Sequence, residues 1–450
     1  MASIRIGTGS AWWGDRISPA KLNAEEGNLD YLCFETMAEA TVSAAQVRKR
    51  RDPGFPGYDT YLDDRMQAVL PGCLKGGTRI ISNQGWINPD GAAERIVHWL
   101  RELGARGIKV AAVSGSLITE RVLRQTDRIL ENGEPTSSLR DSIVSAEAYL
   151  GAEPILAALR DGAQIVVTTR VADPSLFLAP MMYEFGWDPL DHAHLGPGSA
   201  IGHVLECGAQ CTGGYFADPG VKDVSEPWNL AFPIAEVTTN GDAVISKVAG
   251  TGGAITAMTV KEQILYEVHD PANYITPDVI VDFTTAKLEE IGPDRVRISN
   301  ISGKPRTPTL KVSIGCAEGF IGEDMFFYAG PGALGRAQLA RRILEERFRI
   351  IELKAEDVRI DFIGLNAIHG PASPTDRDEP YEVAVRVAAR TLTREEANKI
   401  GREVDGMAVS GVGMTGKRVP HQDRVREVIG VWSSLTPRAQ VPWSVNMYES

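Results

Sequence analysis

Cysteine is scarce in this chain: its 450 residues include only five, and these are far apart in the sequence. An odd number of widely spaced cysteines disfavours a framework of structural disulfides. Long apolar runs are also lacking, since no stretch reaches the roughly 18 residues that a transmembrane helix needs. The first residues, MASIRIGTGS, begin a strand pattern without the apolar stretch of a secretory signal peptide. We therefore expect a cytoplasmic protein with no membrane partner.

Basic residues are fewer than acidic ones. The chain has 47 Lys and Arg against 59 Asp and Glu, so its formal net charge is −12 and its isoelectric point is about 5.2. Proteins that bind nucleic acid normally present a basic face to the phosphate backbone. The charge balance therefore argues against a nucleic-acid partner, and we expect a small-molecule substrate instead.

What the chain does contain is an ordinary globular composition, with 43% hydrophobic and 24% charged residues. In the N-terminal half, short runs of apolar residues alternate with amphipathic segments such as 90–107 and 146–162. Strands that are apolar on both faces and alternate with helices indicate an α/β fold, a largely parallel sheet with helices on both faces. The predicted strands are IRIGTG (4–9), LDYLCFE (29–35), TRIISNQG (78–85), IKVAAVSG (108–115) and AQIVVTTR (163–170).

The composition changes after about residue 190. Residues 190–330 are rich in Gly and Pro with short β-branched runs, which predicts a β-rich extension, and Asn-Gly at 240–241 is a hairpin turn signal. The last hundred residues mix strand and helix patterns. We therefore expect an α/β domain over residues 1–350 that carries the active-site crevice, followed by a small α+β domain over residues 351–450.

Polar or glycine-rich segments follow four of the predicted strands. They read GTGSAWWGDR, SNQGWINPDG, SGS and TTRVADPS. Ligands of open α/β sheets bind in the crevice beyond the carboxyl ends of the strands, so we expect these segments to lie close together. Asn83, Asn88, Arg170 and Asp173 are then candidates to bind polar groups of a substrate, because Arg binds carboxylates in a bidentate fashion.

The segment ECGAQCTGG (206–214), with His203 just before it, concentrates reactive side chains. If residues 202–209 are helical, His203 shares a face with Glu206 and Cys207. Glu206 could then act as a general acid or base with His203 beside it, or Cys207 could act as a nucleophile. Three further positions could approach a carbonyl or carboxylate through flexible backbone, and Gln210 could bind substrate. These three positions are Thr212, Gly213 and Gly214.

A metal site is a further alternative at this segment. His192, His194, His203 and Glu206 are close in sequence, and Cys207 and Cys211 follow. Their spacing departs from the compact ligand sets of zinc sites, so the metal stays an open question. A redox cofactor is disfavoured, because GTGSAWWG has a Trp where the dinucleotide fingerprint needs its third glycine. This favours addition or elimination chemistry over hydride transfer.

Several segments together resemble the acyclic terpene utilisation (AtuA-type) family over roughly residues 4–350, and we expect the resemblance to include the tail. They are IRIGTGSAWWGD, LDYLCFETMAEATVSAAQ, AEAYLGAEPILAALRDGAQIVVTTRVADPSLFLAP and, above all, ECGAQCTGG. One departure is NQGWINP, where the family more often has Asn-Ala-Gly-Gly-Leu-Asn-Pro, and the added Trp86 is expected to reshape that wall. The resemblance implies breakdown of branched acyclic terpenoids as coenzyme A thioesters, with a lyase or hydratase step.

Three hypotheses follow for the function. The first is a lyase or hydratase acting on a hydroxylated carboxylic acid or its coenzyme A thioester, with Glu206 as general acid or base and His203 orienting it. The second is a thioester or amide hydrolase with Cys207 as nucleophile. The third is a non-catalytic subunit that binds an acyl ligand. We also expect a homo-oligomer, for which Trp432 and Trp443 are candidate interface residues.

Overall fold

The computed structural model describes residues 2–125, 127–374, 379–418 and 424–450. The chain forms two compact units, one made of Met1–Gly315 with Val431–Ser450 and the other of Cys316–Gly430. The sequence patterns place the division near residue 350 instead. The difference arises because the helix after residue 332 packs in the second unit and because the last twenty residues return to the first, where their final strand joins the sheet.

A ten-stranded mixed sheet forms the centre of the first unit, in the order β11-β12-β8-β7-β1-β2-β3-β6-β4-β19. Its middle five strands are parallel, and the strands on either side of them run antiparallel. The predicted α/β fold is therefore confirmed, with a sheet that is mixed rather than purely parallel. The parallel strands are β1 (Ser3–Ser10), β2 (Tyr31–Phe34), β3 (Arg79–Ser82), β6 (Ile165–Thr168) and β4 (Lys109–Ser114).

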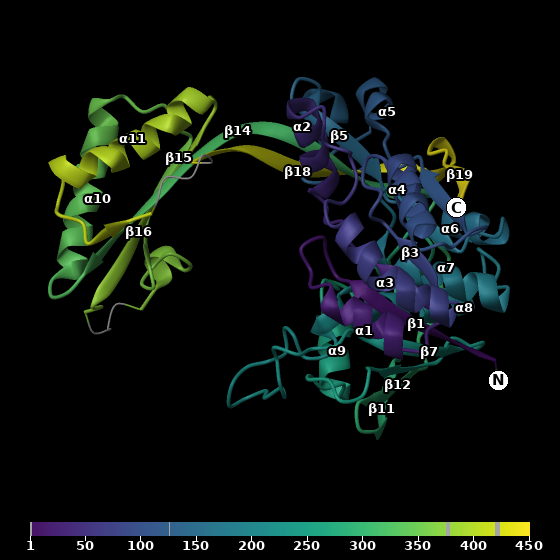
Figure 1. Cartoon of the computed structure of the whole chain (residues 1–450). Helices are drawn as coiled ribbons and strands as arrows, with labels where there is room; N and C mark the ends of the chain where they lie inside the picture. The colour runs from purple at the N-terminus through teal and green to yellow at the C-terminus, as the bar shows by residue number, and fades with distance from the viewer. Residues whose placement is uncertain (1, 126, 375–378, 419–423) are drawn as a thin grey trace. The chain divides into compact units, whose positions relative to one another are not determined.

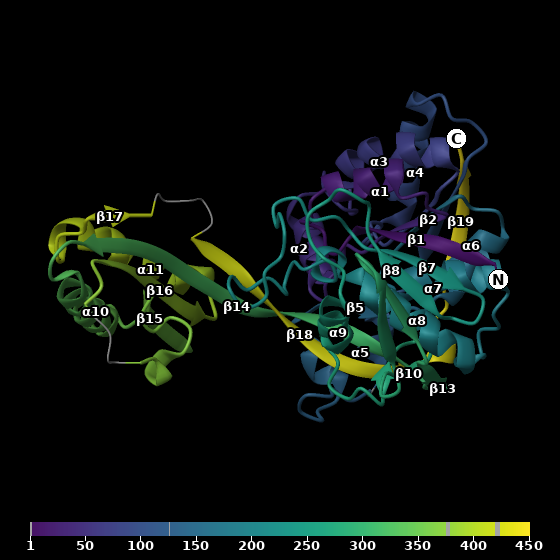
Figure 2. The same ribbon diagram turned by 90° about the horizontal axis from the view of Figure 1, so that it is seen from below.

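Helices cover both faces of this sheet, as Figure 2 shows. On one face α1 (Ser18–Glu26) packs against α3 (Leu62–Gly76), and α3 packs against α4 (Pro89–Glu102). On the other face α7 (Asp173–Phe185) and α8 (His192–Glu206) pack together and contact β1 and β2. The other α-helices before residue 190 are α2 (Thr41–Arg51), α5 (Thr119–Arg124) and α6 (Glu153–Arg160), and β5 (Ile143–Ala148) precedes α6 (Figure 1).

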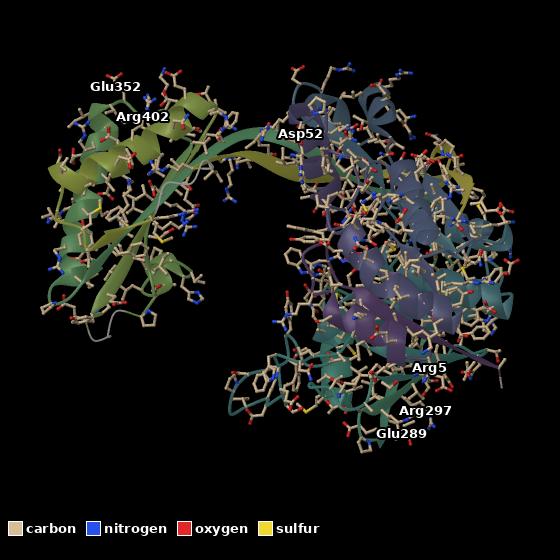
Figure 3. The ribbon with its side chains drawn as sticks, in the orientation of Figure 1. Arg5, Asp52, Glu289, Arg297, Glu352 and Arg402 are labelled. Atoms are coloured by element: carbon tan, nitrogen blue, oxygen red, sulfur yellow. The ribbon has the colours of Figure 1, made fainter. Side chains whose placement is uncertain are left out.

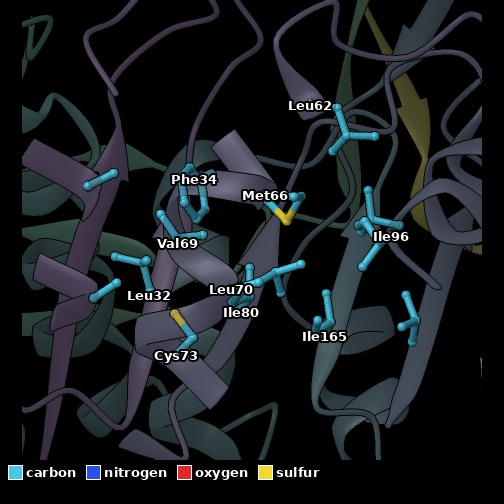
Figure 4. Close-up of a cluster of buried hydrophobic side chains, with 14 of the residues drawn as sticks. Leu32, Phe34, Leu62, Met66, Val69, Leu70, Cys73, Ile80, Ile96 and Ile165 are labelled. Carbon is cyan, nitrogen blue, oxygen red and sulfur yellow. The ribbon is translucent and has the colours of Figure 1, made fainter. Parts of the chain in front are cut away.

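The core between the sheet and α3 explains why these segments fold as they do (Figure 4). Apolar residues recur along α3 at helical spacing and are almost fully buried against β2, β3, β6 and α4. Burial of a single side chain of this size stabilises the fold by roughly 1.5–3 kcal/mol. The helix residues in this cluster are Leu62, Met66, Val69, Leu70 and Cys73, and they face Leu32, Phe34, Ile80, Ile96 and Ile165.

The β-rich extension adds antiparallel strands and two helices, α8 and α9 (Ala257–Leu265). The predicted turn at Asn240-Gly241 joins β7 (Ile234–Thr238) to β8 (Ala243–Ser246), and Gly241 has the positive φ of 84° that such a turn requires. The strands β11 (Lys287–Gly292) and β12 (Arg295–Ser299) form a hairpin. On it, Glu289 and Arg297 form an exposed cross-strand ion pair, with Glu289 Oε2 2.8 Å from Arg297 Nη1 (Figure 3). A three-stranded sheet contains β9 (Tyr274–Ile275), β10 (Ile280–Asp282) and β13 (Ser302–Lys304).

The second unit has its own sheet and its own core. Val383, Val385 and Val387 alternate along β16 and are buried against two helices, one of which contributes Leu344 and Phe348. The two helices are α10 (Ala333–Ile350) and α11 (Arg394–Ser410). Three strands lie wholly in this unit: β15 (Asp357–Ile363), β16 (Glu382–Thr391) and β17 (Gly416–Lys417). Strand β14 (Thr309–Ala329) belongs to it from Cys316 on, and β18 (Val425–Pro437) up to Gly430. The chain then ends with β19 (Ser444–Glu449) in the first unit.

No helix in the described part of the chain combines the length and the apolar character needed to cross a membrane.

Candidate active site

A cavity of about 570 Å³ lies in the first unit beyond the carboxyl ends of β1 and β2 and beside the end of α8. Segments that follow β1, β2 and β6 meet there, as does the segment around Glu206. The cavity wall contains six carboxyl groups and several apolar side chains but, within the described residues, no lysine or arginine. The carboxyl groups belong to Asp15, Glu35, Glu39, Asp173, Glu206 and Glu267.

A second cavity of about 260 Å³ adjoins the first. The two share three acidic residues, Glu39, Asp173 and Glu267, which therefore form a common wall. The second cavity also contacts two cations, Arg170 and Lys311, both of which lie over the ring of Tyr149. The two cavities thus differ in the charged residues that line them. Those of the large cavity are all acidic, whereas those of the second cavity are both acidic and basic.

Glu206 and His203 form a hydrogen-bonded pair at the end of α8. The His203 Nδ1 and Glu206 Oε1 atoms are 2.8 Å apart, as helical spacing of three residues allows. Glu206 is only 5% exposed and His203 is fully buried, with its ring against Tyr274 and Phe283. The other carboxyl oxygen, Glu206 Oε2, is buried and has no hydrogen-bond partner within the described residues, although Glu206 lines the large cavity.

Burial shifts the pKa values of both residues of this pair. Burial raises the pKa of the Glu206 carboxyl well above its usual range, and the nearby Asp173 and Glu267 carboxyls raise it further. Burial also lowers the pKa of His203 to about 4. Near neutral pH the imidazole is therefore neutral, and the same burial favours the protonated form of the Glu206 carboxyl. If His203 Nδ1–H donates to Oε1, then the acidic proton is on Oε2, the oxygen without a protein partner.

Cys207 follows Glu206 and also lines the large cavity. Burial raises the pKa of its thiol far above the usual range, and the Glu206 carboxyl adds to this effect. A nucleophilic cysteine needs a stabilised thiolate, which a nearby base or cation normally provides. Here the His203 Nδ1 atom is engaged by Glu206 instead. The geometry therefore disfavours Cys207 as a nucleophile.

Glu35 and Asn83 form a second buried group in the same region. Asn83 Nδ2 donates to Glu35 Oε1 at 3.1 Å, while Asn83 Oδ1 accepts from the backbone N–H of Thr36. Glu35 Oε1 also accepts from the backbone N–H of Met37 at 2.5 Å. Asn83 is fully buried and does not line the cavity, whereas Glu35 does. Asn83, predicted to bind substrate, therefore positions the Glu35 carboxyl.

Arg170 and Asp173 form the predicted pair. Arg170 donates to both oxygens of Asp173, at 2.8 and 3.4 Å, and its side chain is 3% exposed. Both residues line the second cavity, and Asp173 also lines the first. This placement agrees with the expectation that they lie in one crevice.

Three residues predicted to bind substrate lie elsewhere, which corrects that expectation. Asn88 caps α4, with its side chain accepting from Gly91 N. Thr212 is fully buried and donates to the carbonyls of Ala209 and Ala231. A Cβ on Gly213 would meet Val224, so this glycine allows close packing of two loops. Of the same prediction, Gln210 and Gly214 do line the large cavity.

The histidines near Glu206 do not converge. His192 and His203 are eleven residues apart on one helix, which separates them by about 16 Å along its axis. His192 Nδ1 is bonded to the carbonyl of Gly303, and His194 Nδ1 to Asp191. Among the described residues there is no group of three or more His, Cys, Asp or Glu side chains arranged to hold a metal ion. The alternative of a metal site formed by these histidines therefore has no support among the described residues.

Sequence reasoning missed four carboxyl residues of the cavity: Asp15, Glu35, Glu39 and Glu267. A signal existed for Glu35, because it directly follows the buried strand β2 and so lies at the same sheet edge as the other strand-end residues. Glu267 lies in the β-rich extension, two residues after α9 ends, and no local pattern indicates that it faces the cavity.

A model of one protein family, described as acyclic terpene utilisation family protein AtuA, matches residues 4–447. The chain belongs to the acyclic terpene utilisation family. The match extends through the second unit and into the C-terminal tail, to which the resemblance in the sequence was expected to extend. Membership in the acyclic terpene utilisation family indicates a catabolic role. No curated protein and no solved structure matches the chain.

Proposed function

We propose that this protein is a lyase or hydratase that adds water to, or removes it from, a hydroxylated carboxylic acid or its thioester. The observation that carries the proposal is the buried Glu206 carboxyl, whose Oε2 has no hydrogen-bond partner among the described residues and whose side chain lines the large cavity. Burial raises its pKa and so favours the protonated form. A carboxyl group kept neutral near pH 7 is suited to protonate a leaving hydroxyl group.

In this mechanism His203 positions the acid. Its Nδ1–H fixes Glu206 Oε1, and its pKa of about 4 keeps the imidazole from taking the carboxyl proton. The apolar side chains of Trp12 and Met37 in the same wall exclude water around the acyl chain. The proton then passes from Glu206 Oε2 to the hydroxyl oxygen as the carbon–oxygen bond breaks, and water leaves.

The large cavity suits the acyl end of a coenzyme A thioester but not the phosphates of the coenzyme. The large cavity has no basic side chain among its described lining residues, so nothing there balances the phosphates of coenzyme A. The acyl end of a thioester would therefore occupy the cavity while the nucleotide stays outside it. The two cations, Arg170 and Lys311, line the adjoining cavity, and both are already close to acidic side chains.

The experiment measures turnover of branched 3-hydroxyacyl and 2-enoyl groups, offered as free acids, pantetheine thioesters and coenzyme A thioesters, with products identified by mass spectrometry. Loss of water marks a hydratase, and two carbon fragments mark a carbon–carbon lyase. We expect Glu206→Gln to lower kcat by about 10²- to 10⁴-fold, because the amide cannot donate the acidic proton. Full turnover by Glu206→Gln contradicts the proposal.

A matched control is Glu184→Gln. Glu184 is partly buried on α7 and accepts from Tyr31 Oη at 2.6 Å, at the opposite end of β2 from the cavity. Its replacement by Gln preserves an acceptor, so turnover should stay at the wild-type level. Tight binding of an acyl ligand by calorimetry without turnover by any form would instead support the non-catalytic subunit. Loss of turnover both on thiol alkylation and in Cys207→Ser, with turnover retained by Glu206→Gln, would support the hydrolase.

A further inference from the structure

Elimination of water from a hydroxyacyl group needs a base as well as an acid. Three carboxyl residues lie on the wall common to both cavities and are candidates for the base: Glu39, Asp173 and Glu267. Two of them are already engaged by cations. Asp173 accepts from Arg170 in a bidentate arrangement, and Glu39 Oε1 lies 3.7 Å from Lys311 Nζ.

Glu267 differs from the other two. Partial desolvation and the nearby Glu39 and Asp173 carboxyls raise the pKa of Glu267, whereas His203 and a hydrogen bond from the Tyr266 side chain oppose this rise. None of these neighbours carries a permanent positive charge near neutral pH. Glu267 is also solvent-exposed, whereas Glu206 is almost completely buried. Two carboxyl groups in such different surroundings can hold different protonation states, as an acid–base pair requires.

The backbone holds Glu267 at this position. The helix α9 ends at Leu265, and Glu267 adopts a φ of 61°, a left-handed conformation that is rare for a residue with a Cβ. The same helix is tied to α8, because Gln263 Nε2 donates to the carbonyl of His203 at 3.2 Å. The element that carries Glu267 is thus bonded to the element that carries Glu206.

We propose that Glu267 is the general base that works with Glu206 as the acid, an inference that rests on the proposed function in its water-elimination form. The Glu267 carboxylate takes the proton from C2 of the substrate. The C2–H electron pair forms the C2=C3 double bond, and the C3–O bond breaks. The Glu206 carboxyl gives its proton to the departing oxygen, so that water leaves. Hydration is the reverse of these steps.

The test separates the base from the acid. A saturated butanoyl thioester has no hydroxyl group to lose, so exchange of its C2 hydrogens for deuterium in D₂O requires a base but no leaving-group acid. We expect wild-type protein and Glu206→Gln to catalyse this exchange, measured by mass spectrometry. We expect Glu267→Gln to lose it by about 10²- to 10⁴-fold while its melting temperature stays near that of the wild type.

A second variant guards against misfolding. Asn tolerates the left-handed conformation better than other residues with a Cβ, so Glu267→Asn keeps the backbone and removes the carboxylate at this position. It should lose exchange in the same way. Wild-type exchange by both variants, with elimination abolished by Glu206→Gln, would overturn the role of Glu267 and leave the proposed function intact. Absence of both exchange and elimination in the wild type would overturn both.

Discussion

At the scale of single residues, the same carboxyl group behaves differently at different places in this chain. Asp405 is exposed and accepts hydrogen bonds from Arg424, and its pKa falls to about 2. Glu147 accepts a hydrogen bond from the Ser116 hydroxyl, and burial raises its pKa to about 8. Glu206 is a third case, in which burial raises the pKa and favours the protonated form that the proposed chemistry needs. Solvation and neighbours, rather than residue type, set the proton affinity.

The raised pKa of Glu147 should make the free energy of unfolding depend on pH. Its folded pKa of about 8 lies above the ordinary value of 4.5, so between these pH values the folded state keeps a proton that the unfolded state has released. The free energy of unfolding therefore falls as pH rises through this window. Glu147→Gln removes this pH dependence. We expect the variant to gain a few kcal/mol relative to wild type between about pH 5 and about pH 8, by urea unfolding. A difference that stays constant with pH would contradict this.

At the scale of elements, a buried ion pair fixes the loop that follows β1 against α3. Arg65 in α3 is fully buried, pairs with Asp59, and donates to the carbonyl of Trp13 at 2.6 Å and to that of Trp12 at 3.3 Å. Because Trp12 lines the large cavity, this pair connects the packing of α3 to the shape of the site. The two members of a buried ion pair depend on each other, because removal of one leaves the other charge buried and uncompensated.

Removal of Arg65 should therefore be costly. Arg65→Met leaves Asp59 buried without its cation, and we expect a loss of about 3–5 kcal/mol in the free energy of unfolding. The double variant with Asp59→Asn should recover part of the loss, because no charge is then stranded. As a control, the pair of Arg124 with Glu120 is almost fully exposed, so Arg124→Met should cost less than about 1 kcal/mol. Equal losses at the two sites, by urea unfolding, would argue against this account.

At the scale of the whole molecule, the chain has two compact units with separate cores. Ile96 is fully buried in the first unit and Leu344 in the second, and each contacts side chains of its own unit. The family match covers both units, so both belong to the family's common architecture. The homo-oligomer expected from Trp432 and Trp443 stays a prediction.

Separate cores predict separate unfolding transitions. Truncation of a large buried aliphatic side chain to Ala costs about 2–5 kcal/mol. We expect Leu344→Ala to lower the calorimetric transition of the second unit alone, and Ile96→Ala to lower that of the first unit alone. A single transition that both variants lower equally would show that the units unfold together.

The prediction from sequence was most successful where the signal was local. The apolar runs of the middle strands and the helical spacing of His203 and Glu206 depend on neighbouring residues only, and both appear in the structure. Asn88, Thr212 and Gly213 were assigned to the site because of residue type and nearby motifs. Asn88 instead caps a helix, Thr212 donates to backbone carbonyl groups, and Gly213 allows close packing of two loops. Asn and Thr side chains commonly form hydrogen bonds with nearby backbone groups.

The sequence by itself predicted the α/β fold, because strand and helix periods are properties of short segments. Its motifs indicated the family, and helical spacing placed Glu206 beside His203. Only the tertiary structure decided which carboxyl groups meet. Glu35, Glu206 and Glu267 come from distant segments and line one cavity. Their proximity and their burial depend on how separate elements pack, and burial is what sets their protonation and hence the chemistry proposed for them.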